Sequence, residues 1–318
     1  MKLFPGSAAF AAARPLGDPR LAVAIGNFDG VHLGHQALLA EARARAARRG
    51  GPSAVLTFTP HPARLFAPAK APPLIMSLER RLELCAEAGI DIAVVEPFTR
   101  AFAAMEAEEF VRRVLVQDLA AADVVVGYDF SFGRGRTGTV ARLGELGGAL
   151  GLGVAVIPPV SVDGLPCSST RVRELCAAGQ VAAAAKLLGR ALEVEGRVVR
   201  GAARGRALGF PTANLVPDGE LVPKLGIYAA RARILDGPEA GAVHRAALSI
   251  GRNPTFTGPD APISVEAHLL DYEGDIYDRR LRLEILDRLR DEQRFDTIDA
   301  LIQQIHADVS RVRELVSD

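Results

Sequence analysis

Residues 21–157 alternate between short, continuously apolar runs and longer stretches rich in Ala, Leu, Glu and Arg. Apolar runs without polar alternation are typical of strands that are buried on both faces of a sheet. Strands that alternate with helices favour parallel pairing, and therefore an α/β domain with a doubly wound sheet. The sequence predicts strands at residues 21–26, 53–58, 91–95, 123–127 and 153–157. It predicts helices at residues 36–49, 78–88 and 107–119.

The pattern changes near residue 180. Two short helices are expected at residues 170–178 and 181–188, after which apolar residues recur at every second position. Such alternation indicates half-buried strands, and the turn residues between them favour a small antiparallel β-barrel. These strands are predicted at residues 192–200, 227–234, 264–270 and 281–285. We therefore predict two domains, comprising residues 1–187 and 188–318.

The chain ends in a predicted amphipathic helix, for which Asp296 is the expected N-cap. Apolar residues at spacings of three and four form one stripe along this helix. The stripe consists of Ile298, Leu301, Ile302, Ile305, Val309 and Val312.

Composition narrows the possible partners and compartments. Lys and Arg total 38, as do Asp and Glu, so the formal net charge is zero. A neutral chain argues against nucleic-acid and membrane-surface partners, which usually require a basic excess. No apolar run reaches the roughly 20 residues of a membrane span, and the apolar N-terminal stretch is too short for a signal peptide. The three cysteines form no Cys-x-x-Cys pair, which fits packing roles in a reducing cytoplasm.

Residues 25–35 read Ile-Gly-Asn-Phe-Asp-Gly-Val-His-Leu-Gly-His, at the junction of the first predicted strand and helix. The unpaired amides and the dipole of a helix N-terminus favour an anion at such a junction. Glycines allow the backbone to bend and to approach a ligand closely; they are Gly26, Gly30 and Gly34. His32 and His35 are three residues apart, so one helical turn would place both imidazoles on one face. The window is suited to chemistry on a phosphate.

Three further windows follow predicted strands, at residues 57–62, 127–136 and 167–173. Aromatic residues at strand ends, such as Phe58, can cover a flat ring. Ser168, Ser169 and Thr170 are residue types that cap helices well and donate hydrogen bonds to phosphate. An arginine such as Arg173 can bind phosphate oxygens with two parallel hydrogen bonds. Taken alone, the Ser-Ser-Thr run is better explained by an ordinary helix cap, and Gly-Arg-Gly-Arg at residues 133–136 by a solvated basic loop.

The second half has its own signature, Gly-Arg-Ala-Leu-Gly-Phe-Pro-Thr-Ala-Asn-Leu, at residues 205–215. Its glycines can shape a loop whose amides face phosphates. Thr212 and Asn214 alternate on an extended segment, so both side-chain oxygens point the same way, as suits Mg²⁺. Glu266 lies on the polar face of a predicted strand. Without further information, the Pro-Thr-Ala-Asn run would be assigned to a turn, and Glu266 to a solvent-facing position.

The first-half motifs resemble those of a known family. His-Leu-Gly-His resembles the His-x-Gly-His signature of nucleotidylyltransferases, and residues 168–173 resemble their Ser-Ser-Thr-x-x-Arg element. The longer form that begins at Gly26 resembles the adenylyltransferase half of bacterial bifunctional riboflavin kinase/FAD synthetases, which implies a Rossmann-like domain. The resemblance implies that His32, His35 and Arg173 steady the ATP phosphates and the charge that develops on the α-phosphoryl group. The implied ATP contacts are Gly26, Asn27, Phe28, His32, His35, Ser168, Ser169, Thr170 and Arg173, and the implied flavin contacts are Phe58, His61 and Asp129.

The Gly-Phe-Pro-Thr-Ala-Asn run resembles the flavokinase element of the same family, and the windows 253–256, 265–268 and 290–295 recur in order. The resemblance implies that Glu266 accepts the proton of the riboflavin 5′-hydroxyl and that Thr212 and Asn214 bind Mg²⁺. The implied ATP contacts of the kinase are Gly201, Gly205, Gly209, Pro211, Thr212, Asn214 and Asn253. The implied flavin contacts are Glu266, Arg294 and Phe295. Ser249 and the loop at residues 258–262 depart from the family pattern, which affects only the expected detail of the ATP loop.

These observations lead us to expect a cytoplasmic bifunctional enzyme that phosphorylates riboflavin to FMN and adenylylates FMN to FAD. Its expected partners are ATP, Mg²⁺ and flavins, with no nucleic acid and no membrane, and its oligomeric state is left open. Two alternatives remain at this point. One is a nucleotidylyltransferase for another phosphate ester, and the other is a degenerate nucleotide-binding domain fused to an RNA-binding barrel.

Overall fold

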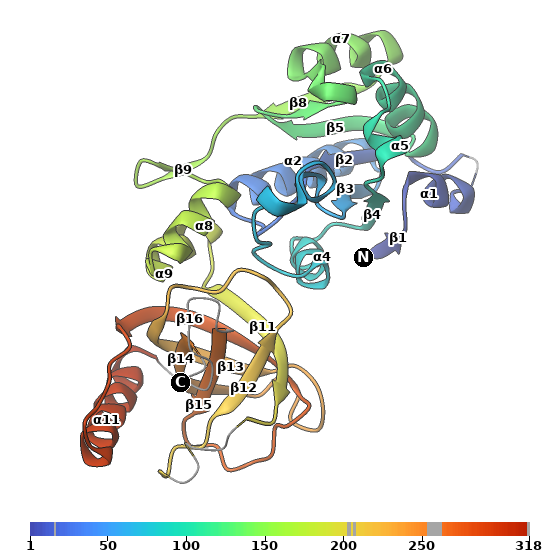
Figure 1. Ribbon diagram of the computed structural model, residues 1–318. Helices are drawn as coiled ribbons and strands as arrows, with labels where there is room; N and C mark the ends of the chain where they lie inside the picture. The colour runs from blue at the N-terminus through green and yellow to red at the C-terminus, as the bar shows by residue number, and fades with distance from the viewer. Residues whose placement is uncertain (16, 202–204, 206–207, 253–262, 317–318) are drawn as a thin grey trace. The chain divides into compact units, whose positions relative to one another are not determined.

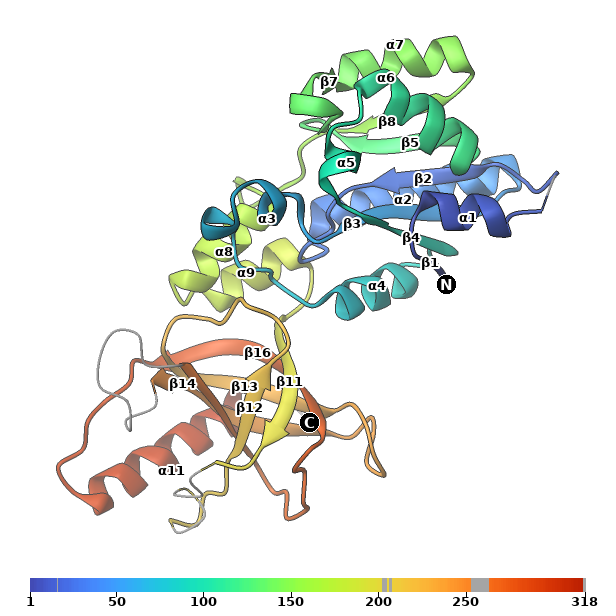
Figure 2. The same cartoon turned by 45° about the vertical axis from the view of Figure 1, so that its right-hand side comes forward.

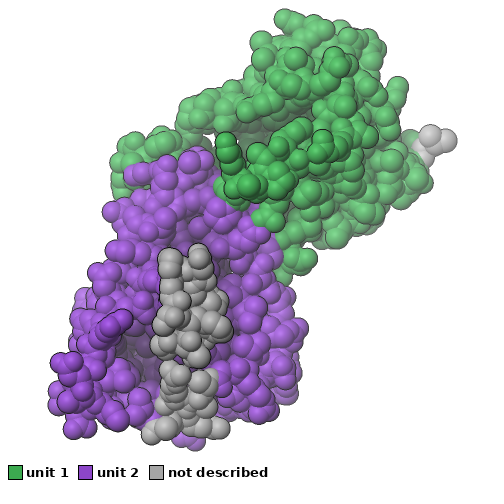
Figure 3. All heavy atoms as spheres, in the orientation of Figure 1, with its two compact units in different colours: residues 1–72, 78–167 green, residues 73–77, 168–318 purple. Residues whose placement is uncertain are grey.

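The computed structural model describes all residues except 16, 202–204, 206–207, 253–262 and 317–318. These residues form two compact units, which are coloured in Figure 3. The first unit contains residues 1–72 and 78–167, and the second contains residues 73–77 and 168–318. Among the described helices, none combines the length and the apolarity that a membrane span requires.

A six-stranded parallel sheet lies at the centre of the first unit (Figure 1), in the order β1-β4-β3-β2-β5-β8. Its strands are β1 Lys2–Phe4, β2 Leu21–Ile25, β3 Ser53–Thr59, β4 Ile92–Pro97, β5 Ala121–Gly127 and β8 Gly153–Ile157. The expected parallel α/β sheet is therefore confirmed, with strand ends that differ by at most two residues. β1 and the helix α1 Ser7–Ala13 were not predicted, because a three-residue edge strand is too short to show a period.

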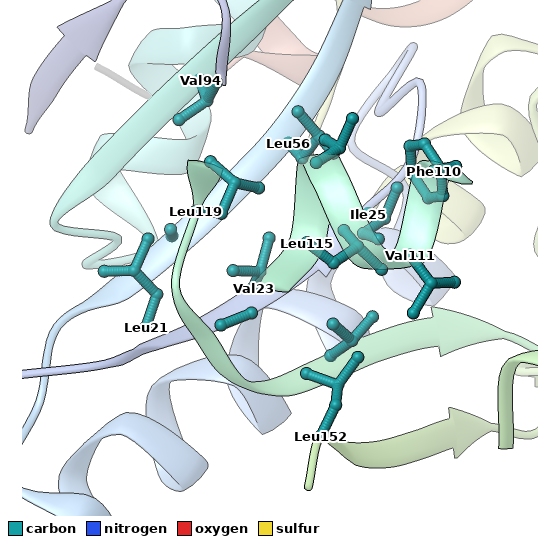
Figure 4. Packing of buried hydrophobic residues seen from close by; sticks show 14 of the residues in the cluster. Leu21, Val23, Ile25, Leu56, Val94, Phe110, Val111, Leu115, Leu119 and Leu152 are labelled. Carbon is teal, nitrogen blue, oxygen red and sulfur yellow. The ribbon is translucent and has the colours of Figure 1, made fainter. Parts of the chain in front are cut away.

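Helices cover both faces of this sheet, as Figures 1 and 2 show. The helix α2 packs on β2, β3 and β5, while α1 and the segment at residues 110–118 pack together on the opposite face. Burial of apolar side chains between these layers provides the main driving force for folding of this unit. Figure 4 shows part of the core, in which Val23 and Ile25 of β2 meet Phe110 and Leu115. The helices are α2 Leu33–Arg49, α3 Pro62–Phe66, α4 Leu78–Glu87, α5 Arg100–Ala103, α6 Ala107–Glu109 and α7 Val140–Leu150.

The helix expected at residues 107–119 is not a uniform α-helix. Its first turn is α6, and Phe110–Asp118 is wound as a π-helix. The amide of Leu119 donates to the Val114 carbonyl at 3.0 Å, which is a bond across five residues. Hydrogen bonds across five residues wind a π-helix more loosely than an α-helix, so residues four or five apart share one face. This winding therefore brings Phe110, Val114, Leu115 and Leu119, which are all buried, onto the face that meets the sheet.

The second unit is built around a closed six-stranded barrel in the order β11-β12-β15-β14-β13-β16, in which all described neighbours are antiparallel. Its strands are β11 Leu192–Val199, β12 Ala213–Pro217, β13 Gly226–Ile234, β14 Val243–Arg252, β15 Ile263–Leu269 and β16 Arg280–Arg290. The predicted barrel is confirmed. β14 was missed although Ala246, Leu248 and Ile250 alternate inward, and β16 runs five residues beyond its predicted end at residue 285.

The helices of the second unit are α8 Ser169–Ala177, α9 Val181–Leu188 and α11 Ile298–Leu315. One detail predicted for α11 is wrong. Its N-cap is Thr297, whose Oγ1 accepts from the Ala300 amide at 3.2 Å, rather than Asp296. The apolar stripe is buried mainly toward the C-terminal end, where Val312 joins Ala229 in a small core, whereas Ile298 is 64% exposed. The other residues of the predicted stripe are half-buried or buried.

Candidate functional site

The loop between β2 and α2 is tightly folded. Phe28, Gly30 and Val31 have positive φ values of 50°, 87° and 39°, and the Val31 amide donates to the Phe28 carbonyl at 3.0 Å. Gly26 and Gly34 do not have positive φ, contrary to the expectation that all three glycines bend the chain. They provide space instead, because a Cβ at Gly34 would lie 3.1 Å from the His32 ring and one at Gly26 would lie 3.3 Å from the Phe28 ring. The loop therefore fixes the start of α2.

His32 and His35 lie together at the N-terminus of α2. Their rings stack with centroids 3.7 Å apart and an interplanar angle of 21°. His32 is the N-cap of the helix, and its Nδ1 accepts from the His35 amide at 3.4 Å. A nitrogen that accepts carries no hydrogen, so the hydrogen of a neutral His32 ring resides on Nε2. The helix thus begins with an imidazole N–H donor at its N-terminus, where the helix dipole favours negative charge.

A cavity of about 880 Å³ lies at the carboxyl ends of the strands in the first unit. Ligands of doubly wound sheets bind at this edge. Four residues expected in the site line this cavity: Gly26, Asn27, Phe58 and Asp129. Its wall is largely aromatic, and the aromatic side chains come from several loops: Phe58, Phe66, Phe98, Phe102, Phe110, Phe130 and Phe132. The arrangement can hold a flat, apolar ring system.

Sequence analysis missed several residues of this cavity. Phe98, Arg100 and Phe102 follow β4, and Phe98 packs edge-on against Phe58 with ring centroids 5.7 Å apart. The sequence pattern could have identified these residues, because aromatic and basic residues follow β4 as they follow β3 and β5. Arg134 and Arg136, which lie in the window at residues 127–136 that the sequence singled out, also line the cavity; Arg134 forms an ion pair with Glu106 at 2.6 Å, and Arg136 donates to Ser131 at 2.7 Å.

His61 plays a local structural role. Its Nδ1 accepts from the Ala63 amide at 3.2 Å and caps the short helix α3. The next two residues, Pro62 and Ala63, line the cavity. His61 therefore sets the direction of the chain that carries this part of the wall.

Asp29 and Arg81 are buried charges near the β2–α2 loop that the sequence did not single out. Asp29 is 1% exposed and Arg81, on α4, is 3% exposed. Burial lowers the pKa of the Arg81 guanidinium, while the charge of Asp29 acts in the opposite direction. Opposite charges of this kind reduce the cost of burying either group.

The Ser-Ser-Thr-x-x-Arg element begins α8, in the second unit. The Ser168 Oγ accepts from the Arg171 amide at 3.1 Å, so Ser168 is the N-cap. The Nε of Arg173 donates to the Pro73 carbonyl at 2.7 Å. Ser169 and Thr170 occupy the first turn of the helix, where backbone amides lack intrahelical partners.

In the barrel, the predicted kinase residues converge on β12 and β15. Thr212 Oγ1 donates to Glu266 Oε2 at 3.3 Å. Asn214 lies directly opposite Glu266 in the register of the two strands. Thr212 and Asn214 flank the buried Ala213, so both side chains lie on the half-buried face. A Cβ at Gly201 would lie 2.2 Å from Asn214 Nδ2, so a glycine there allows close approach.

The loop before β12 turns sharply. The Gly205 carbonyl accepts from the amides of Leu208 and Phe210, at 3.1 and 2.8 Å, and Gly209 has φ of +87°. Among the other expected residues, Arg294 is exposed, and Phe295 lies with the guanidinium carbon of Arg290 5.9 Å from its ring centroid. Asn253 lies outside the described residues.

The donors near Glu266 fit Mg²⁺. Thr212, Asn214 and Glu266 supply hydroxyl, amide and carboxylate oxygens, which are hard ligands. In the described part of the chain, no three His, Cys, Asp or Glu side chains gather as a metal cage. Mg²⁺ usually keeps several waters and shares phosphate oxygens with its substrate, so one or two protein ligands are enough.

The described cysteines are free, as their spacing predicted. Burial raises the pKa of the Cys85 and Cys176 thiols to about 12. Both therefore remain protonated near neutral pH and act as small apolar packing residues.

Comparisons with known proteins cover nearly the whole chain. The family model for FAD synthetase matches residues 16–171, and that for riboflavin kinase matches residues 188–316. A bifunctional riboflavin kinase/FMN adenylyltransferase from Pseudomonas fluorescens is 41% identical over 293 residues, which is 92% of each chain. The protein of the same name from Escherichia coli K12 is 38% identical over 291 residues, which is 91% of each chain.

A solved structure from Streptococcus pneumoniae, titled as a macrolide-efflux protein, has a TM-score of 0.84 and 31% identity. It covers 98% of this chain and 99% of its own, so the two folds correspond throughout. The matches to both halves, in the same order as in the relatives, show that this chain belongs to the family of bifunctional riboflavin kinase/FMN adenylyltransferases.

Proposed function

We propose that the chain makes FAD from riboflavin in two ATP-dependent steps, each of which uses the residues described above. The observation that carries this proposal is the convergence of Thr212, Asn214 and Glu266 in the barrel. A nucleotidylyltransferase for another phosphate ester has no use for a second phosphoryl-transfer site. We assign the adenylyltransferase to residues 1–187 and the kinase to residues 188–318.

In the kinase step, Glu266 accepts the proton of the riboflavin 5′-hydroxyl. The hydroxyl oxygen forms a bond to the γ-phosphorus of ATP, the bond from this phosphorus to its β-bridging oxygen breaks, and ADP leaves. Thr212 and Asn214 would hold Mg²⁺, which would neutralise negative charge on the phosphates. The loop formed by Gly201, Gly205, Gly209 and Pro211 binds ATP, together with Asn253. Arg294 and Phe295 contact the flavin.

In the adenylyltransferase step, a phosphate oxygen of FMN attacks the α-phosphorus of ATP, the bond to the β-bridging oxygen breaks, and pyrophosphate leaves. His32 Nε2, His35 and Arg173 donate to the phosphates as negative charge shifts in the transition state. Ser168, Ser169 and Thr170 add hydroxyl and amide donors. No covalent enzyme intermediate is required, since positioning and electrostatic stabilisation supply the rate.

The aromatic cavity binds the flavin of FMN in this step. Phe58 and the neighbouring aromatic side chains cover the apolar ring system of the flavin, and Asp129 accepts hydrogen bonds from FMN. Gly26, Asn27 and Phe28 contact ATP. His61 caps α3 and so fixes the position of Pro62 and Ala63 in the cavity wall. An offset or edge-on aromatic contact contributes about 1 kcal/mol beyond the area it buries.

The proposed setting is the cytoplasm, where ATP and Mg²⁺ are available and thiols stay reduced. The proposed partners are small molecules alone, because the chain carries no net charge with which to bind nucleic acid or an anionic membrane.

Incubation of the purified chain with riboflavin, ATP and Mg²⁺, followed by HPLC, tests the proposal. FMN should appear first and FAD second, and supplied FMN should yield FAD directly. Absence of both products under conditions in which the protein is folded would overturn it. A filter-binding assay with RNA across a salt titration is the parallel control, and salt-dependent binding without flavin turnover would favour an RNA-binding barrel.

A further inference from the structure

The polar face of β15 contacts the loop before β12 at two consecutive residues. Glu266 accepts from the Thr212 hydroxyl at 3.3 Å, and His268 Nδ1 lies 2.8 Å from the Pro211 carbonyl oxygen. Glu266 and His268 are two positions apart on the strand and therefore lie on the same face. Pro211 and Thr212 are thus fixed to one strand by neighbouring hydrogen bonds.

The bond to Pro211 has a defined direction. A carbonyl oxygen only accepts, so His268 Nδ1 carries the hydrogen. Proline has no amide hydrogen, so its carbonyl is the only backbone group through which a hydrogen bond can hold it. Gly205 and Gly209 precede it, and glycines leave the backbone many alternative conformations. A side-chain donor at this carbonyl therefore fixes the Pro211 peptide group to β15.

The preceding residue is held by ring contacts. The Phe210 ring lies edge-on to His268, with centroids 5.6 Å apart, and to His306 of α11, with centroids 5.1 Å apart. Two residues beyond His306, Asp308 accepts from Arg290 of β16 at 3.0 and 2.7 Å and from Gln304 at 3.0 Å. α11 is thereby fastened to the barrel, and Phe210 is held between a strand and a fastened helix.

We propose that His268 is a positioning residue of the kinase reaction. Its Nδ1–H bond to Pro211, supported by the contacts of Phe210 with His268 and His306, sets the position of the Thr212 hydroxyl relative to Glu266. His268 acts through Pro211 and touches neither the reacting hydroxyl nor the phosphates. This inference rests on the proposed kinase function of Thr212 and Glu266.

Two substitutions of similar size separate the hydrogen bond from the bulk of the ring. In His268→Asn, the amide nitrogen is the same number of bonds from Cα as Nδ1 and can donate to Pro211. In His268→Leu, a methyl group takes that place and cannot donate. We expect the Leu variant to lose about tenfold in kinase kcat/KM for Mg·ATP, and the Asn variant to stay within about threefold of the wild type. The KM for riboflavin should change less than the KM for Mg·ATP.

Hydrogen exchange provides a readout that does not depend on turnover. In ligand-free full-length protein, the peptide spanning residues 208–215 should exchange faster in His268→Leu than in the wild type or His268→Asn. Peptides from β13 and β16 should remain unchanged. FAD synthesis from supplied FMN, measured on the same samples, should stay at the wild-type level and serves as the control for overall folding.

The outcomes are distinguishable. A folded wild-type chain that makes no FMN would refute the proposed function itself, before any variant is compared. With an active wild type, equal kinetics and equal exchange in the two variants would overturn the positioning role. Equal losses in both variants would overturn it as well, because the ring and not the hydrogen bond would then matter. A loss of FAD synthesis in parallel with FMN synthesis in His268→Leu would likewise overturn it, as a general effect on folding.

Discussion

The stacked imidazoles of His32 and His35 at the start of α2 have different structural roles. His32 caps the helix through Nδ1, whereas His35 stacks on the His32 ring and its proposed role is to donate to the phosphates. We predict that Ala at either position reduces FAD formation by about 2–4 kcal/mol of transition-state stabilisation. His32→Ala should also lower the free energy of unfolding by about 1 kcal/mol, because a helix cap is lost.

Conversion of supplied FMN to FAD, followed by HPLC, and urea unfolding of the same samples measure these two effects. FMN formation from riboflavin should be nearly unchanged in both variants. His32→Asn is the matched control, since asparagine is a good N-cap and should restore stability without restoring full activity. Equal loss of FAD and FMN formation would contradict the assignment of the histidines to one step.

Glu266 is placed to act as the base of the kinase. A riboflavin hydroxyl is a weak acid, and a carboxylate that accepts its proton late in transfer typically contributes ~10²–10⁴-fold. Gln keeps the size of Glu266 and the oxygen that accepts from Thr212, but it cannot take up a proton. We predict that Glu266→Gln retains riboflavin and Mg·ATP binding and loses most kinase turnover.

The paired measurement for this prediction is riboflavin titration by fluorescence quenching and kinase turnover by HPLC. FAD synthesis from supplied FMN should continue, because it uses the other site. Near-normal turnover in the variant would remove Glu266 as the base and leave positioning as the main source of catalysis.

A buried ion cluster fastens α2 to the sheet. Asp123 of β5 is 2% exposed and accepts from Arg45 at 2.9 Å and from Arg49, both on α2. Burial alone would raise the pKa of this carboxyl, but the hydrogen bonds from Arg49 and Arg45 outweigh it and the pKa is lowered from 3.8. A carboxyl with a lowered folded-state pKa stabilises the fold above its unfolded pKa, and this contribution is lost as pH falls through the folded value.

We therefore predict that Asp123→Asn lowers the free energy of unfolding by about 2 kcal/mol at pH 7, as is typical for lost hydrogen bonds to charged groups. The difference between wild type and variant should begin to shrink as pH falls below 3.8, where the carboxyl of the unfolded chain takes up a proton, and should be lost once pH falls through the lower folded-state pKa. Urea unfolding curves at a series of pH values test this. A difference that stays constant with pH would show that the charge of Asp123 does not contribute.

The boundary between the two compact units determines which fragments of the chain should fold by themselves. α9 packs on β11 and β16 and buries Val181, Ala184, Leu187 and Leu188 within the second unit. The sequence placed the domain boundary after residue 187, whereas the compact units divide between residues 167 and 168. We predict that a fragment of residues 168–318 makes FMN but no FAD. A fragment of residues 190–318 should be less stable by about 3 kcal/mol or more, since those apolar contacts are lost.

Thermal unfolding and riboflavin phosphorylation of the two fragments test this division. Both fragments lack residues 73–77, so the comparison isolates α8 and α9. Equal stability of the two fragments would mean that α8 and α9 contribute nothing to the barrel. A folded 168–318 fragment without kinase activity would show that the kinase assignment is wrong.

The sequence by itself determined the architecture and the local pairs. Buried parallel strands and half-exposed barrel strands differ in period, and that period records which faces are buried. The expected sheet and barrel were confirmed for this reason. His32 and His35 are neighbours along one helical turn, so their pairing also followed from spacing alone.

Only the tertiary structure decided the contacts between residues that are distant in sequence. The cavity is lined by loops that follow several different strands. The order of the strands in the sheet, which local sequence patterns do not encode, brings Phe98 and Arg100 into the same cavity as Phe58 and Asp129. The contact of His268 with Pro211 spans 57 residues for the same reason. The N-cap of α11 was decided by a side-chain hydrogen bond of Thr297, and the π-helix at Phe110–Asp118 by its backbone hydrogen bonds and its packing on the sheet. Periodicity fixes which side of an element is buried, but the partner on that side depends on the fold as a whole.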